Sequence, residues 1–113
     1  MSRITMTRPD DWHIHVRNGA VLKTVLPHTA RQFARAIIMP NLKPPVTTVE
    51  QALTYRKEIL QAVPAGIDFI PLMTLYLTAT TKISEIKKAA ESDQIYAFKL
   101  YPAGATTNSD SGI

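Results

Sequence analysis

A regular alternation of strand-like and helix-like segments is the feature that most constrains how this chain folds. Four short apolar segments are expected to form strands, at residues 12–16, 36–39, 69–76 and 95–101. Between them lie stretches with apolar residues at helical spacing, at residues 20–26, 47–63 and 81–90. An alternation of this kind predicts a parallel sheet whose strands are joined by right-handed helical crossovers.

Local signals set the expected ends of these segments. Thr47 and Glu50 have the spacing of a capping box, so we expect a helix to begin there and to end at Pro64. Pro27 is expected to disturb the end of the first helix, and a short strand at residues 4–6 could precede the first strand. Pro71 counts against the third strand, because proline cannot donate a backbone hydrogen bond within a sheet. Four aromatic side chains are expected in the core: Trp12, Phe69, Tyr96 and Phe98.

Four parallel strands with three crossovers can form a small open sheet or the N-terminal half of a (βα)₈ TIM-type barrel. A barrel of this type needs ~250 residues, whereas this chain has 113. Residues 106–113 form a polar segment with no helical pattern that could cover the fourth strand. We therefore expect residues 1–113 to be the N-terminal part of a single, incomplete barrel domain, with exposed strand edges.

The composition excludes several classes of protein. There is no cysteine, which excludes disulfides and thiolate metal ligands. The net charge is +4, but the basic residues are scattered, so we expect a solvated basic surface and no nucleic-acid partner. The chain begins with no apolar signal core, and no run approaches membrane-spanning length, so we expect a cytoplasmic protein with no membrane contact.

Two histidines one residue apart lie in the first predicted strand. Successive side chains of a strand point to opposite faces, so His13 and His15 share one face, and two imidazoles so placed can hold one metal ion. Arg17 follows on the same face, and its positively charged guanidinium can bind a carboxylate through two parallel hydrogen bonds. The alternative is a pair of strand histidines that are satisfied by hydrogen bonds.

Polar residues from other segments are predicted to reach the same edge of the sheet. Active sites of parallel βα folds lie at the carboxyl ends of the strands, where Asn41, Lys99 and residues 106–107 fall. Lys99 lies within an apolar strand, where loss of solvent favours the neutral amine. A neutral amine can add carbon dioxide to form a carbamate, which is an anionic oxygen ligand for metals. The alternative is a lysine whose amine reaches solvent at the strand end.

Three segments carry a resemblance to a known family. Residues 8–17 (RPDDWHIHVR), 39–48 (MPNLKPPVTT) and 99–108 (KLYPAGATTN) resemble, in order and at matching spacing, the N-terminal part of the bacterial single-domain dihydroorotases of the amidohydrolase superfamily. The resemblance extends over essentially the whole chain. It implies a barrel enzyme of pyrimidine synthesis that interconverts N-carbamoyl-L-aspartate and L-dihydroorotate.

The resemblance also implies a metal centre. His13 and His15 would ligate the more buried of two zinc ions, and a carboxylated Lys99 would bridge both ions. Zinc held in this way activates water and polarises the scissile carbonyl.

The remaining matching residues are implied to bind substrate. Arg17 and Asn41 would hold the α-carboxylate of carbamoyl aspartate or dihydroorotate. Thr106 and Thr107 would belong to a mobile loop that closes over the small-molecule substrate and excludes water. The family also suggests a homodimer.

One part of the family pattern is missing from these residues. The catalytic aspartate and the further histidine ligands of the family come from later strands, so the resemblance implies that they lie beyond Ile113. After Lys99 this chain has no histidine and only one acid, Asp110, which does not match the catalytic aspartate. No catalytic residue is therefore assigned within residues 1–113, and we expect this polypeptide alone to be inactive and to bind zinc weakly. Two alternatives stay open: another cyclic amidohydrolase, such as a hydantoinase or allantoinase, and a non-catalytic βα binding module.

Overall fold

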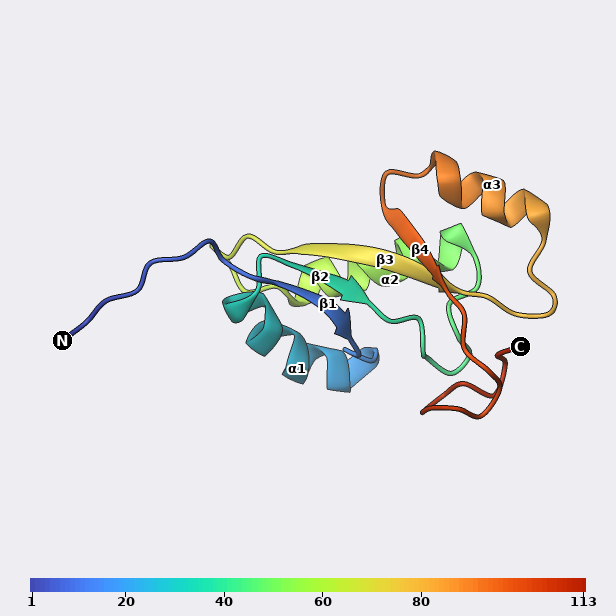
Figure 1. Ribbon diagram of the computed structural model, residues 1–113, viewed down its shortest axis with the longest axis horizontal. Coiled ribbons are helices and arrows are strands. Elements are labelled where there is room, and N and C mark those ends of the chain that lie inside the picture. Colours follow the sequence, from blue (N-terminus) through green and yellow to red (C-terminus); the bar gives the residue numbers. More distant parts are fainter.

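Strands and helices alternate along the whole of the computed structural model, which describes residues 1–113 (Figure 1). The strands are β1 (Asp10–Ile14), β2 (Arg35–Ile38), β3 (Ile70–Tyr76) and β4 (Ile95–Lys99). The helices are α1 (Gly19–Gln32), α2 (Val49–Ala62) and α3 (Ile83–Glu91). All strands run parallel in the order β1-β2-β3-β4, so each helix joins two neighbouring strands. The predicted architecture of four parallel strands alternating with helices is confirmed.

The hydrophobic core is one cluster between the sheet and the helices. Helix α1 contributes Leu22, Leu26 and Ala30, which are spaced four residues apart and therefore lie on one side of the helix, fully buried. Phe69 is buried and Phe98 packs against the cluster, as predicted. This packing fixes the sheet, and hence the positions of the loops at the carboxyl ends of its strands.

Predictions for three local features are wrong. Helix α1 continues through Pro27, because its buried face extends beyond that residue to Ala30. Helix α2 is capped one residue later than expected, since the Thr48 hydroxyl accepts from the Gln51 amide at 3.2 Å. Residues 4–6 are not a strand: residues 1–9 contain no helix or strand and lead away from the sheet (Figure 1).

A shift of register in β1 moves Trp12 out of the core. The three steps from Asp11 to Ile14 match only two steps in β2, from Ala36 to Ile38. Strict alternation therefore fails within β1, and Trp12, which was expected beside Ile14 in the core, is 73% exposed.

A similar shift in β4 explains the second aromatic error. Met73 pairs with Ile95, whereas the next residue of β3, Thr74, pairs with Ala97. The additional residue, Tyr96, is 58% exposed instead of buried. Both shifts lie in the outer strands of the sheet.

Pro71 lies within β3 without disrupting the sheet. The amide of Ile70 donates to Ala34 on the β2 side, and the amide of Met73 donates to Gln94 on the β4 side. The nitrogen of Pro71 therefore faces β4, whose pairing begins only at Met73. The missing donor falls where no partner strand is present.

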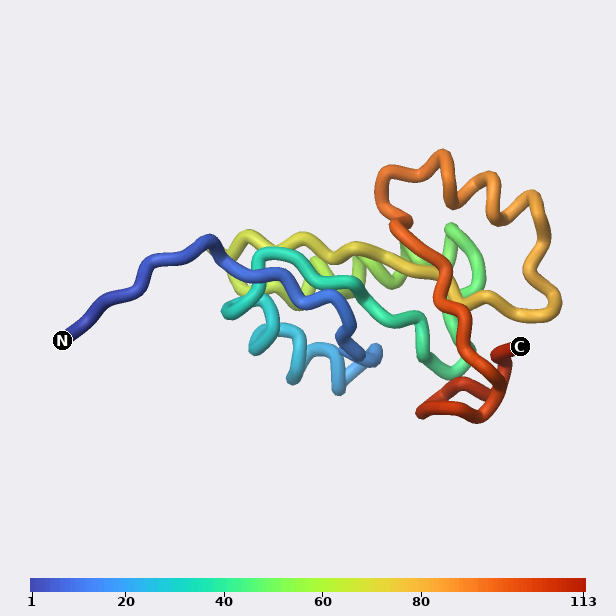
Figure 2. Tube along the Cα trace, in the orientation of Figure 1, coloured from blue at the N-terminus to red at the C-terminus, as the bar shows by residue number.

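The carboxyl ends of β2 and β4 lead into two loops that meet. The red segment after β4 lies beside the segment that follows β2 in both views (Figures 1 and 2), and hydrogen bonds join them. None of the three helices has the length and apolar character required to cross a bilayer.

Candidate active site

His13 and His15 converge at the carboxyl end of β1. Their Nε2 atoms are 3.3 Å apart, so the common face predicted for the two imidazoles is observed. The Nδ1 atom of His15 is buried and has no hydrogen-bond partner. Burial, assisted by the charges of Lys99, Arg17 and His13, lowers the pKa of His15 to about 4. The His15 ring is therefore neutral at neutral pH, which is the form that binds metals.

Lys99 ends β4 and reaches the same region. A cavity of about 260 Å³ is lined by both His13 and Lys99. The Lys99 Nζ donates to the Asn41 Oδ1 at 2.7 Å and lies 4.6 Å from the centroid of the Tyr101 ring. Burial, followed by the charge of Arg17, lowers the pKa of Lys99. No acidic side chain is paired with the amine, so no salt bridge opposes this lowering of the pKa.

Asn41 connects three parts of this edge of the sheet. Its side chain is 1% exposed. The Oδ1 accepts from Lys99, and the Nδ2 donates to the backbone oxygen of Thr107 at 3.0 Å. Its own backbone oxygen accepts from the Arg17 Nη1 at 3.3 Å. Asn41, in the loop after β2, is thus bonded to the end of β4, to the loop after β4 and to the loop after β1.

Arg17 reaches the site by a turn and not by strand alternation. Strand β1 ends at Ile14. Arg17 has a φ of 57°, in the left-handed region that residues other than glycine rarely adopt. The sequence prediction placed its guanidinium near the histidines, and its charge does contribute to the lowered pKa of His15. The expected position is therefore reached, but by a different backbone path.

The segment after β4 folds around a buried serine. Ser109 is fully buried, and its hydroxyl donates to the Thr106 backbone oxygen at 2.6 Å and accepts from the Thr106 amide at 3.0 Å. The side chains of Thr106 and Thr107 are exposed, and the contact with Asn41 is made by the Thr107 backbone. Sequence reasoning did not find Ser109, and no periodic signal marks it.

The last residues of this segment contribute no side chain to the cavity. Ile113, beyond which the resemblance places the catalytic aspartate, has an exposed side chain, and its amide donates to the Tyr101 backbone oxygen at 3.2 Å. Asp110 is exposed as well. Neither residue lines the cavity shared by His13 and Lys99, so neither takes the place of a catalytic acid or base there. The position of the catalytic aspartate stays a prediction.

Tyr101 and Thr74 are further residues of this region that the sequence analysis did not assign to it. Both line the cavity shared by His13 and Lys99. Alternation along the predicted strand places Tyr101 on the same face as Lys99, and the structure agrees, although no role in the site was assigned to its ring. The Thr74 hydroxyl donates to the Ile38 backbone oxygen at 2.6 Å, which satisfies its own buried polar group.

The donor set fits part of a metal site. Two imidazole nitrogens converge, one ring is held neutral, and a desolvated amine lines the same cavity. No group of three or more His, Cys, Asp or Glu side chains is placed to hold a metal ion. A complete zinc site normally needs at least three protein ligands. A third ligand is therefore not supplied by a His, Cys, Asp or Glu side chain of residues 1–113.

The structure thus has parallel strands with two histidines and a lysine at their carboxyl ends, and comparison with known families gives the class of protein. The chain belongs to the amidohydrolase family, whose model matches residues 10–113. Within that family, its curated relatives include the dihydroorotase of Alkalilimnicola ehrlichii. The two are 69% identical over 113 residues, which are 100% of this chain and 33% of the relative.

Solved structures agree with the fold. The dihydroorotase of Campylobacter jejuni superimposes with a TM-score of 0.85 and 40% identity, over 94% of this chain and 30% of that one. The dihydroorotase of Saccharomyces cerevisiae, in complex with 5-fluoroorotic acid, gives a TM-score of 0.84 and 38% identity, over 93% and 28% of the two chains. The chain therefore spans about a third of the length of the relatives it matches, and its fold is that of their N-terminal part.

Proposed function

We propose that this chain supplies part of a zinc-dependent dihydroorotase, which reversibly cyclises N-carbamoyl-L-aspartate to L-dihydroorotate in de novo pyrimidine biosynthesis. The observation that carries the proposal is the convergence of two imidazoles and a partly buried lysine amine on one edge of the sheet. The 69% identity to a dihydroorotase over all 113 residues supports the choice of substrate. In this proposal residues 1–113 are part of a single barrel domain, which further strands complete.

The proposed metal ligands are His13, His15 and Lys99. The neutral Lys99 amine would form an N–C bond with carbon dioxide and lose a proton, which leaves a carbamate with two oxygen donors able to bridge two zinc ions. When bound, zinc would lower the pKa of water and polarise the scissile carbonyl. The lowered pKa of His15 keeps its ring available as a ligand, and the lowered pKa of Lys99 favours the amine form that reacts.

Arg17 and Asn41 are the proposed ligands of the substrate α-carboxylate. Both lie beside the metal-ligand candidates, and a guanidinium and an amide can together donate several hydrogen bonds to one carboxylate. The yeast relative was solved with 5-fluoroorotic acid, itself a carboxylic acid, which supports this role. Thr106 and Thr107 would cover the bound substrate and exclude water. We further propose a cytoplasmic homodimer that contacts neither nucleic acid nor membrane.

The test is a chimera in which residues 1–113 replace the matching third of the Alkalilimnicola ehrlichii dihydroorotase. The chimera is assayed with dihydroorotate, hydantoin and allantoin, and its zinc content is measured by elemental analysis. We expect turnover of dihydroorotate, with His13→Ala and Lys99→Ala each lowering kcat/KM by at least about 100-fold and reducing bound zinc. His28→Ala is the matched control, because His28 is an exposed histidine of α1.

Three results would contradict the proposal. A folded chimera without dihydroorotate turnover would remove the proposed activity. A preference for hydantoin or allantoin would favour another cyclic amidohydrolase. A 113-residue chain that folds cooperatively by itself, and whose His13→Ala and Lys99→Ala variants keep ligand binding, would favour a non-catalytic βα binding module.

A further inference from the structure

The segment between β1 and α1 has an unusual backbone conformation. Arg17 and Gly19 both lie in the left-handed region, with φ of 57° and 59°, while Asn18 between them is extended. Glycine adopts this conformation readily, but a residue with a side chain does so only where its surroundings hold it. The segment therefore needs contacts from outside itself to keep Arg17 in place.

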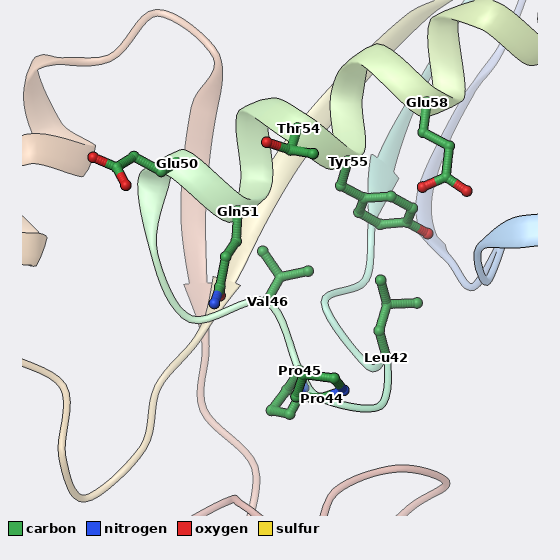
Figure 3. Close-up of a pocket in the computed structure, with 9 residues that line it drawn as sticks. All are labelled: Leu42, Pro44, Pro45, Val46, Glu50, Gln51, Thr54, Tyr55 and Glu58. Atoms are coloured by element: carbon green, nitrogen blue, oxygen red, sulfur yellow. The ribbon is translucent and has the colours of Figure 1, made fainter.

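Two side chains of α2 provide such contacts. The Tyr55 hydroxyl donates to the Arg17 backbone oxygen at 2.5 Å, and the Glu58 Oε1 accepts from the Gly19 amide at 2.6 Å. Tyr55 and Glu58 are three positions apart, so they lie on the same side of the helix. Figure 3 shows both side chains on the side of α2 that faces the blue start of α1. The Tyr55 side chain is almost fully buried, which restricts its orientation.

Helix α1 depends on Glu58 because its own cap is incomplete. The Asn18 side chain makes no capping hydrogen bond, and the first turn of α1 contains no acidic residue. A carboxylate beside the first amides of a helix satisfies a free donor and interacts favourably with the helix dipole. Glu85 of α3 makes the equivalent contact to the Val49 amide of α2 at 2.6 Å, but α2 also has its own cap from Thr48.

Both contacts hold the backbone of the segment that carries the Arg17 side chain. Its guanidinium reaches across to the backbone oxygen of Asn41, at the edge where the histidines and Lys99 meet. A change in the backbone of Arg17 would swing this long side chain away from that edge. The placement of a substrate-binding side chain depends on the residues that hold its backbone.

We propose that Tyr55 and Glu58 are positioning residues, which act through the backbone of residues 17–19 to hold the Arg17 guanidinium toward the substrate carboxylate. This inference rests on the proposed function, because it takes Arg17 to bind substrate. Neither residue touches the reacting atoms. Their removal should therefore weaken substrate binding and leave the chemical step and the metal site intact.

The experiment uses the chimera that contains all 113 residues, with KM and kcat for dihydroorotate and zinc content as readouts. Tyr55→Phe removes one hydroxyl, and we expect KM to rise about five-fold while kcat changes by less than about twofold. Glu58→Ala should act in the same way, whereas Glu58→Gln keeps an acceptor for the Gly19 amide and should restore KM to within about twofold of the unsubstituted chimera. Zinc content should be unchanged in all three variants.

A double substitution separates positioning from general damage to the fold. Arg17→Ala alone should raise KM by about 10- to 100-fold. If Tyr55 acts through Arg17, Tyr55→Phe should have no further effect on KM in the Arg17→Ala background. Glu50→Gln is the matched control, because Glu50 lies on the same helix and lines the same cavity of about 340 Å³ as Tyr55 and Glu58, and its side chain makes no hydrogen bond.

The possible results distinguish two failures. If Arg17→Ala leaves KM unchanged, the carboxylate-binding role of Arg17 is wrong and the positioning role falls with it. If Arg17→Ala raises KM but Tyr55→Phe and Glu58→Ala do not, only the positioning role is wrong. The positioning role is also wrong if Tyr55→Phe lowers kcat or zinc content, or keeps its full effect in the absence of the Arg17 side chain.

Discussion

The buried side chain of Asn41 should control how firmly the segment after β4 is held. Its Nδ2 donates to the Thr107 backbone oxygen at 3.0 Å, and its Oδ1 accepts from Lys99 at 2.7 Å. The substitution Asn41→Ala removes both contacts, together with a longer contact of 3.5 Å from the Nδ2 to the Asn108 backbone oxygen. The 3.0 Å bond to Thr107 is the stronger of the two that hold residues 102–113, so the effect on that segment is close to that of one hydrogen bond.

The expected magnitude is modest and measurable. A neutral hydrogen bond contributes about 1 kcal/mol net, which corresponds to a factor of about five in an equilibrium constant. Backbone amides of residues 103, 104, 106, 112 and 113 donate within this segment or to the chain next to it. Opening of the segment exposes these amides together. Their hydrogen-exchange rates should therefore rise about five-fold in Asn41→Ala, while rates in α1 and β3 stay constant.

The assay is hydrogen exchange followed by mass spectrometry, carried out on the chimera in the absence of substrate. Asn18→Ala is the control, because Asn18 is an exposed asparagine whose side chain makes no capping hydrogen bond. Unchanged exchange of residues 102–113 in Asn41→Ala would refute the anchoring role of Asn41. An equal increase in Asn18→Ala would show that the effect is not specific to the contact with Thr107.

Three further substitutions test other parts of the structure in the chimera. Leu26→Ala removes a fully buried side chain of α1 and should lower the free energy of unfolding by about 2–5 kcal/mol, measured by urea denaturation. Gly112→Ala would place a Cβ atom 2.3 Å from the backbone oxygen of Tyr101, so residues 102–113 should shift and be cut faster in limited proteolysis. The hydrogen bond from Arg35 lowers the pKa of Asp10, so this pair stabilises the fold above the unfolded pKa of about 4 and loses its effect as the pH falls through the folded pKa. The stability difference between the unsubstituted chimera and Asp10→Asn should accordingly shrink between pH 7 and pH 3, and a difference that stays constant would contradict this assignment.

The order of the elements follows from the sequence because it depends on local periodicity. The apolar run at residues 36–39 and the helical stripe of α2 each predict their element without knowledge of the rest of the chain. Trp12 and Tyr96 were misplaced for a different reason. Each lies at a one-residue shift of register, which is decided by pairing with a neighbouring strand and leaves no periodic trace in its own segment.

The candidate site likewise has residues that the local sequence pattern locates and residues that only packing between elements brings there. The end of a parallel strand is a position that sequence can locate, and the structure does bring Asn41 and Lys99 to one edge of the sheet. The metal-binding and substrate-binding roles of these residues stay predictions. Tyr55 and Glu58 could not be found in this way, because they lie on an ordinary amphipathic helix. Their contacts with residues 17–19 arise only when α2 packs beside α1.

In the proposed metal centre, the charges at this edge of the sheet would disfavour a bound metal ion until Lys99 is modified. Lys99 and Arg17 both act on His15 as cations, and no acidic side chain completes a metal-ligand group there. A divalent ion would therefore meet two positive neighbours and no anionic side chain, which is an unfavourable electrostatic environment. Conversion of the Lys99 ammonium to a carbamate changes its charge from +1 to −1 and supplies the missing anionic ligand. Metal and carbon dioxide should consequently promote each other's binding, because the coupling between two ligands is reciprocal. In this proposal Arg17 would then remain as a cation of the site, which is the charge that a substrate carboxylate would require.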